Sequence, residues 1–195
     1  MHTEFFVSTA ACVGALCSVQ QTAIELSLAA KNAKAIAYRA GTRALGFKPL
    51  TDYIDEMGRD TSRLVAEIDA TALCIARRAV DEVRLVDAGE RLRRARASMP
   101  PDETAVAALL DDLEQALVAN RQDITRGLHR LYQLLGDINQ RMRAAAVIST
   151  RARVEATQAG EYERGLQLVA DTVERSAITI RTIITRCEGE LRNAA

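Results

Sequence analysis

The residues that decide the fold of this chain run from Asn32 to Phe47 and read NAKAIAYRAGTRALGF. An alanine-rich run ends at Gly41, a second glycine follows at Gly46, and Pro49 stands where the first turn of another helix would begin. Glycine often ends a helix because it enters the left-handed conformation without strain, and proline is tolerated in a first helical turn. The stretch therefore predicts a helical hairpin with its tip at residues 41–46.

The same arrangement of glycines returns between residues 151 and 166. Gly160 follows Gly41, and Gly165 follows Gly46, by the same distance along the chain (160 − 41 and 165 − 46 are both 119). The recurrence predicts a second helical hairpin with its tip between these two later glycines.

Away from the tips, apolar residues recur at spacings that alternate between four and three, the a/d pattern of helices that pack on one another. The first seam contains Phe5, Thr9, Cys12, Leu16, Val19, Ala23, Leu26, Ala30, Ala33, Ala37 and Ala40. The second contains Leu50, Ile54, Met57, Thr61, Leu64, Ile68, Thr71 and Ile75, and then shifts register to Ala79, Val83 and Val86. The third contains Val106, Leu110, Leu113, Leu117, Asn120, Ile124, Leu128, Leu131, Leu135, Ile138, Met142, Ala145, Ser149, Ala152, Ala156 and Ala159. The fourth contains Val169, Val173, Ser176, Ile180, Ile183 and Cys187.

These seams predict an all-α fold, a long antiparallel four-helix bundle or coiled coil built from two tandem helical hairpins. Residues 1–99 form the first hairpin and residues 100–195 the second, with a break at Pro100-Pro101 and the second tip at 160–165. Adding 119 to the first six positions of the second seam gives the fourth seam, so both tips are expected at the same end of one bundle. The middle two helices are expected to extend past the outer two at the other end.

The composition agrees with long helices and argues against several classes of partner. Charged residues make up 27% of the chain and proline occurs three times. The 26 basic and 26 acidic residues balance, which leaves no electrostatic footprint for nucleic acid. The local cluster Arg91, Arg93, Arg94 and Arg96 is interpreted as cations near a helix C-terminus, with a polyanion contact as the alternative.

Cysteine and histidine usage predicts neither a metal nor a cofactor. The cysteines at 12, 17, 74 and 187 form no Cys-x-x-Cys pair, so we expect reduced cysteines in the core of a cytoplasmic protein. His129 stands alone, and no phosphate loop or Ser/His/Asp order is present, so no catalytic residues and no enzyme are predicted. The apolar segment 5–19 lacks a preceding basic residue, which argues against a signal sequence, and is too short for membrane insertion.

The two tips resemble the cytoplasmic hairpin tip of methyl-accepting chemotaxis receptors, in which Asn-Ala-x-x-Glu-Ala-Ala-Arg-Ala-Gly-Glu precedes a Gly-Phe. The first tip matches at Asn32-Ala33, Arg39-Ala40-Gly41 and Gly46-Phe47. The second matches at Val154-Glu155-Ala156, Ala159-Gly160-Glu161, Arg164-Gly165 and Leu168-Val169-Ala170-Asp171-Thr172-Val173. The match covers roughly half of the chain and assigns nothing to residues 102–137 beyond a helix.

The resemblance implies a tandem, soluble version of that signalling domain, in which one chain supplies the four helices that two receptor chains supply together. It implies partner proteins at the tip: a chemotaxis histidine kinase, a coupling protein or chemoreceptors. The sequence departs from the family where Ile36 replaces the tip glutamate and Gln158 replaces the tip arginine, so each repeat keeps one member of that pair, Glu155 or Arg39. The arms are too short to include a methylation segment.

The candidate site is therefore the pair of tips. The expected partner-binding residues are Asn32, Tyr38, Arg39, Phe47, Glu155, Glu161, Tyr162 and Arg164, and the expected turn glycines are Gly41, Gly46, Gly160 and Gly165. Tyr38, Phe47 and Tyr162 are three of only seven aromatic residues, and aromatic side chains are over-represented at binding hot spots. Phe47 could instead staple its own hairpin.

Three functions remain open at this point. The first is a chemoreceptor-like signalling or scaffold protein that acts through protein contacts at the tips, in chemotaxis or motility signalling. The second is a structural coiled-coil module that has lost kinase coupling and organises another assembly. The third is a bundle that holds an apolar ligand or haem, which requires a cavity and an inward histidine. The chain is expected to be a monomeric pseudo-dimer or a homodimer.

Overall fold

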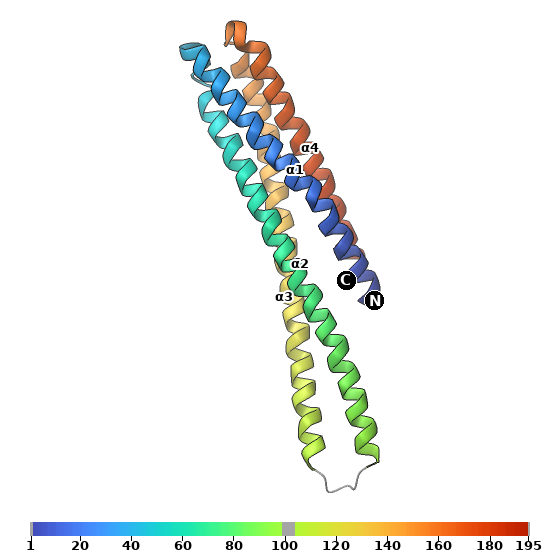
Figure 1. Ribbon diagram of the computed structural model, residues 1–195. Coiled ribbons are helices and arrows are strands. Elements are labelled where there is room, and N and C mark those ends of the chain that lie inside the picture. Colours follow the sequence, from blue (N-terminus) through green and yellow to red (C-terminus); the bar gives the residue numbers. More distant parts are fainter. Residues whose placement is uncertain (1, 99–103, 195) are drawn as a thin grey trace. The chain divides into compact units, whose positions relative to one another are not determined.

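The computed structural model describes residues 2–98 and 104–194, with the side chains of residues 11–12, 14–98 and 105–192. Four α-helices follow one another, with a short 3₁₀ turn inside each bend (Figure 1). In order these are α1 (His2–Ala40), η1 (Gly41–Ala44), α2 (Lys48–Ala97), α3 (Thr104–Ala156), η2 (Gly160–Tyr162) and α4 (Glu163–Ala194). No strand occurs in these two ranges, and the predicted all-α bundle is confirmed.

The chain divides into two compact units. The tip unit contains Thr3–Asp69 and Gln133–Ala195, which include α1, α4 and the adjoining parts of α2 and α3. The α2–α3 unit contains Ala70–Tyr132. Each predicted hairpin, 1–99 and 100–195, contributes residues to both units.

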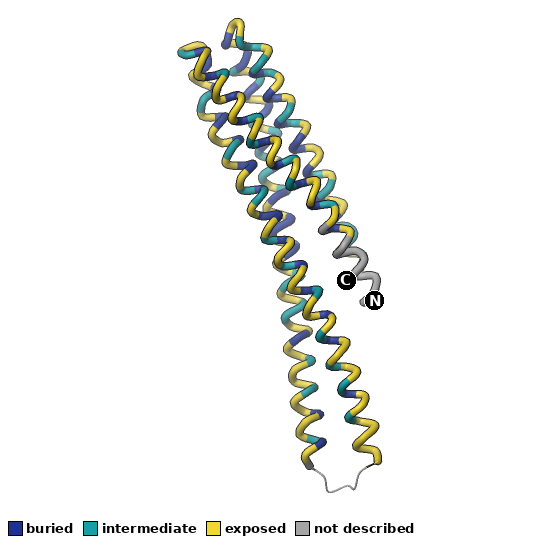
Figure 2. The backbone as a smooth tube through the Cα atoms, viewed as in Figure 1, coloured by how far each residue is buried: buried dark blue, intermediate teal, exposed yellow. Residues whose placement is uncertain are grey.

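In the tip unit the predicted seams form the core. Figure 2 shows buried positions recurring along each helix. Wherever their side chains are described, the predicted seam residues of α1, from Cys12 to Ala40, are all buried. Near the tips the core consists mainly of alanine, which lets helices approach closely; farther away leucine, isoleucine and methionine fill it. On α4, Ile184 is fully buried and Ile183 is half-buried, so the seam there lies one residue later than predicted.

In the α2–α3 unit the predicted shift of the α2 seam to Ala79 agrees with the structure, but the residues predicted after Ala79 are corrected. Val83 and Val86 are 58% and 38% exposed, whereas Glu82 and Gly89 are buried. Ala72 and Ala79 are buried, whereas Thr71 is half-buried and Arg78 is exposed, so the register does shift, and it does so at Ala72. From there the four-and-three spacing runs through Ile75, Ala79 and Glu82. Apolarity favoured the valines, but the geometry of the helix places Glu82 in the seam.

The buried glutamate is compensated by an ion pair. The Glu82 carboxylate accepts a hydrogen bond from Arg121 Nε at 2.7 Å. Asn120, predicted at a core position, is buried, and its Nδ2 donates to the carbonyl oxygen of Arg78 at 2.7 Å. This unit thus places two polar side chains in its seam, each with a hydrogen-bond partner.

The basic cluster at the end of α2 is exposed and largely paired. Arg91 contacts Asp87 at 2.7 Å, Arg94 contacts Glu90 at 3.3 Å, and Arg93 contacts Glu114 of α3 at 3.1 Å. Arg94 and Arg96 lie in the last turn of α2, as the interpretation of helix-end cations requires.

Only two of the four cysteines lie in the core, which corrects the expectation for the others. Cys12 and Cys187 are buried, whereas Cys17 and Cys74 are exposed. Cys17 follows the seam residue Leu16 directly, and a neighbouring position on a helix faces another direction.

Some predictions concern residues outside the described part: the Pro100-Pro101 break and the side chains of Phe5 and Thr9. Across 2–98 and 104–194, no helix is both long and apolar enough to span a membrane.

Candidate functional site: the paired hairpin tips

Both bends are made by glycines in the left-handed conformation. Gly41 has a φ of 60° and Gly160 a φ of 61°, values that residues with a Cβ adopt only with strain. A 3₁₀ turn follows each glycine, and the Phe47 amide then donates to the Ala44 carbonyl at 3.1 Å. Gly41 and Gly160 therefore recur in conformation as well as in spacing, whereas Gly165, predicted as a turn glycine, lies inside the first turns of α4.

The two tips lie together at one end of the tip unit (Figure 1). Arg43 of the first bend contacts Glu161 of the second through Nη1 and Oε1, 3.8 Å apart. A Cβ placed on Gly160 would lie 3.3 Å from the same arginine nitrogen, so the bends are in close approach. The prediction of both tips at the same end is confirmed.

An ion pair inside each hairpin recurs with the same offset of 119 residues. Lys34 Nζ lies 2.6 Å from Asp52 Oδ1 between α1 and α2. Arg153, 119 residues after Lys34, contacts the equivalent Asp171 between α3 and α4 at 2.9 Å. Arg153 also pairs with Glu174, and hydrogen bonds to Glu174 and Asp171 raise the pKa of the arginine.

The second glycine of each tip contacts the opposite hairpin at equivalent positions. A Cβ on Gly46 would lie 1.9 Å from Oε2 of Glu155, so the carboxylate rests directly against the glycine. A Cβ on Gly165 would lie 3.3 Å from Cδ1 of Ile36. Ile36 and Glu155 are themselves 119 residues apart, and each fills the space beside the other repeat's glycine.

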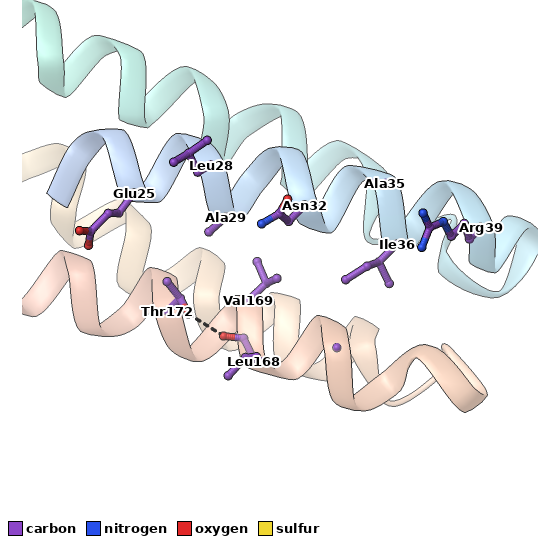
Figure 3. Close-up of a pocket in the computed structure, with 11 residues that line it drawn as sticks. Glu25, Leu28, Ala29, Asn32, Ala35, Ile36, Arg39, Leu168, Val169 and Thr172 are labelled. Atoms are coloured by element: carbon purple, nitrogen blue, oxygen red, sulfur yellow. Dashed lines mark hydrogen bonds between the residues drawn. The ribbon is translucent and has the colours of Figure 1, made fainter. Parts of the chain in front are cut away.

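Two grooves flank the tips, one between each pair of neighbouring helices from different hairpins. The α1/α4 groove has a volume of about 620 Å³ and is lined by Glu25, Leu28, Ala29, Asn32, Ala35, Ile36, Arg39, Gly165, Leu168, Val169 and Thr172. Figure 3 shows Ile36 extending from α1 toward α4 and Val169 extending from α4 toward α1. The α2/α3 groove has a volume of about 590 Å³ and is lined by Gly46, Pro49, Leu50, Tyr53, Ala144, Val147, Ile148 and Arg151.

The two grooves occupy equivalent places in the repeat. Gly46 and the three α2 residues that line the α2/α3 groove become, 119 residues later, the four α4 residues of the α1/α4 groove. Its four α3 residues become Glu25, Leu28, Ala29 and Asn32 when 119 is subtracted. All eight lining residues thus have a counterpart in the other groove.

The lining residues are equivalent in place but different in chemistry. The α1/α4 groove presents an acid, an amide and a cation, Glu25, Asn32 and Arg39. In the α2/α3 groove the counterpart of Glu25 is Ala144, and Tyr53 and Val147 provide exposed apolar surface beside Arg151. One groove is therefore mixed in charge and the other mainly apolar.

All but one of the predicted partner-binding residues are exposed or half-buried. Exposed are Asn32, Tyr38, Arg39, Glu161 and Arg164, and half-buried are Glu155 and Tyr162. Tyr38 is 79% exposed, and the Lys48 ammonium lies 5.8 Å from the centre of its ring. Asn32 and Arg39 also line the α1/α4 groove.

Phe47 does not belong among the partner-binding residues. Its side chain is fully buried, so it packs the first bend and is not available to another protein. The sequence left this alternative open, since an aromatic residue after a bend can serve either purpose.

Sequence reasoning missed the apolar residues of both grooves. Leu28, Leu168, Tyr53 and Val147 are all at least 49% exposed and line a groove. In the sequence, Ile24 and Leu28 form a second apolar stripe beside the α1 seam, which indicates a second neighbouring helix; the structure leaves both residues exposed, with Leu28 in the groove.

The described side chains offer little to a metal or haem. In the part of the chain that the structure describes, no three His, Cys, Asp or Glu side chains gather in a group that could hold a metal ion. His129 is exposed, with its Nδ1 3.2 Å from the carbonyl oxygen of Thr125, so it does not point into a cavity.

Comparisons with protein-family models, with curated protein sequences and with solved structures give no match for this chain.

Proposed function

We propose that this protein is a chemoreceptor-like signalling or scaffold protein that acts through protein contacts at its paired hairpin tips, in chemotaxis or motility signalling within the cytoplasm. In this proposal the chain works without catalysis, and its partners are a chemotaxis histidine kinase, a coupling protein or chemoreceptors.

One observation carries the proposal: turn, ion pair and groove all recur 119 residues apart, with both bends at one end. This arrangement is what a receptor dimer would produce if its two hairpins were joined in one chain. Part of this support lies outside the matched residues, because Lys34, Asp52 and Arg153 of the ion pairs are not among them.

The exposed chemistry at the tips supports partner binding. The α1/α4 groove combines apolar side chains with Asn32 and Arg39. Tyr38, which precedes Arg39 in the sequence, is exposed. Protein interfaces combine apolar area with a few polar groups. Tyrosine and arginine are enriched among the interface residues whose replacement by alanine weakens binding most.

The direct test is a pull-down with the immobilised chain and the chemotaxis histidine kinase and coupling protein of the same organism. We expect the native chain to retain at least one of them. The Arg39→Ala/Glu155→Ala chain should lose most of this binding, whereas Arg84→Ala, an exposed arginine of the α2–α3 unit, should not. Retention of both proteins by the double variant would contradict a tip-mediated contact.

The alternative function is a structural module that keeps the bundle and organises another assembly. The divided Arg39 and Glu155 pair favours it, since each repeat retains only half of the family's tip motif. Absence of binding by the native chain to either chemotaxis protein would support this alternative and reject the first proposal.

A further inference from the structure

Cys12 and Cys187 lie opposite each other in the core of the tip unit, where α1 and α4 run antiparallel. Near the tips Ile36 of α1 faces Gly165 of α4. Cys12 lies 24 residues before Ile36 on α1, and Cys187 lies 22 residues after Gly165 on α4. In an antiparallel pair these similar separations place the two cysteines at the same level. The Cys187 thiol lies 3.8 Å from the carbonyl oxygen of Cys12, and both side chains are at most 3% exposed.

The two thiols also interact with each other. A hydrogen bond with the Cys12 thiol lowers the pKa of Cys187 and, as its counterpart, raises the pKa of Cys12, with burial adding to the latter effect. Cys187 is therefore the first of the pair to form a thiolate, the reactive form of cysteine. Cys17 and Cys74 are exposed and lie off the seams.

We propose that Cys12 and Cys187 constitute a dithiol site that reacts with small-molecule disulfides and closes to an intramolecular disulfide between α1 and α4. The inference stands apart from the proposed function, because it depends on the core of the tip unit and not on the tips.

The reaction balances as two exchanges. The Cys187 thiolate attacks one sulfur of the small-molecule disulfide, forms a mixed disulfide and releases one thiolate, which takes up a proton. Cys12 then loses its proton, attacks the Cys187 sulfur and releases the second small-molecule thiol. In total, two protein thiols are oxidised to one disulfide, and one small-molecule disulfide is reduced to two thiols.

Closure joins residues 175 positions apart, so it restricts the unfolded chain strongly and fixes the ends of α1 and α4 together. Because both thiols are buried, the reagent reaches them only when these ends open, and exchange should be slow in the native protein and faster in mild denaturant. The site would thus stabilise the tip unit when small-molecule disulfides accumulate.

The test uses the Cys17→Ser/Cys74→Ser chain, which changes two exposed positions and keeps the buried pair. After incubation with oxidised glutathione, unfolding and alkylation, we expect the mass of an intact monomer that has lost two hydrogen atoms and takes up no alkylating reagent. Its thermal unfolding temperature should exceed that of the reduced chain, and dithiothreitol should reverse both changes.

A matched chain that also carries Cys187→Ala should remain monomeric and keep one alkylatable thiol or one glutathione adduct. Circular dichroism before treatment checks that both variants are helical. The proposal is overturned if the chain with the buried pair retains two alkylatable thiols after prolonged incubation in mild denaturant, or yields only disulfide-linked dimers or glutathione adducts.

Discussion

Gly41 and Gly160 each reverse the chain with a φ near 60°. Their surroundings differ, because only a Cβ on Gly160 would lie within 4 Å of another residue, Arg43. A Cβ on Gly41 would meet nothing within 4 Å, so a substitution there tests backbone conformation alone. The helical Gly136 has equal space but an ordinary helical backbone, which makes it a matched control.

We predict that Gly41→Ala lowers the free energy of unfolding by about 1–2 kcal/mol, because alanine is strained in the left-handed conformation. Gly136→Ala should raise it by about 0.5–1 kcal/mol, because alanine favours a helix interior. Urea denaturation of both variants measures the difference. Equal effects of the two substitutions would show that the bend tolerates a side chain.

Glu82 is the residue at which a simple hydrophobic pattern misleads. It is 5% exposed and paired with Arg121, whereas the valine that follows it is exposed. Burying a carboxylate costs hydration free energy, and leucine at position 82 would remove that cost. Arg121 would not be left as a buried charge, because its side chain is already 59% exposed.

Glu82→Leu should therefore raise the free energy of unfolding by about 1 kcal/mol, with Arg121 turning toward solvent. Glu90→Leu, at an exposed position of the same helix, is the control and should change it little. Hydrogen exchange of the amides in residues 70–98 reports on this unit directly. A clear loss of protection in Glu82→Leu would mean that the ion pair contributes net stability.

At the scale of elements, the close contact between α3 and the first bend can be tested through Gly46. An alanine there forces the Glu155 carboxylate to move, because the new Cβ would lie 1.9 Å from it. We expect Gly46→Ala to be destabilising in the native chain and close to neutral in a Glu155→Ala background. Thermal unfolding of the four chains gives the coupling, expected at about 0.5–3 kcal/mol for residues in contact.

Gly165→Ala provides the matched measurement in the other repeat, where the Cβ would lie 3.3 Å from the end of Ile36. A small effect there is expected, because a flexible side-chain end can shift by a few tenths of an ångström. Additive effects of Gly46→Ala and Glu155→Ala would show that the two residues do not interact.

The sequence predicted the helices and bends well because both depend on short-range rules. A four-and-three spacing places residues such as Leu26 and Ile54 on one face of a helix, and both are fully buried. Glycine spacing located both bends for the same reason. Position in the sequence alone could not show that Phe47 is buried and Tyr38 exposed, because the burial of a side chain depends on its neighbours in space.

The grooves and the cysteine pair escaped prediction for a related reason. Leu168 has no unusual context in the sequence, and it lines a groove only because α1 lies beside α4. Cys12 and Cys187 are both seam residues, but their being opposite depends on the register between the first and last helices. Such registers are properties of the assembled helices.

At the scale of the molecule, the two-hairpin organisation predicts how halves of the chain behave. A segment covering residues 1–98 alone would expose the seams of α1 and α2, and residues 104–194 alone would expose those of α3 and α4. We expect the two segments, produced together, to co-purify in equal amounts and to reproduce the helical circular dichroism of the intact chain. Size-exclusion chromatography of each segment alone supplies the control. Two independently stable monomers with no affinity for each other would reject this organisation.

The unequal grooves have a consequence for how such a protein can diverge. In a dimer of identical chains, any substitution alters both copies of a docking surface at once. Here Glu25 and Ala144, or Tyr53 and Thr172, hold equivalent places but are separate positions of one chain, so each can be substituted without the other. Each half can therefore acquire its own specificity, and a binding protein that distinguishes them would attach once per chain, in a single orientation.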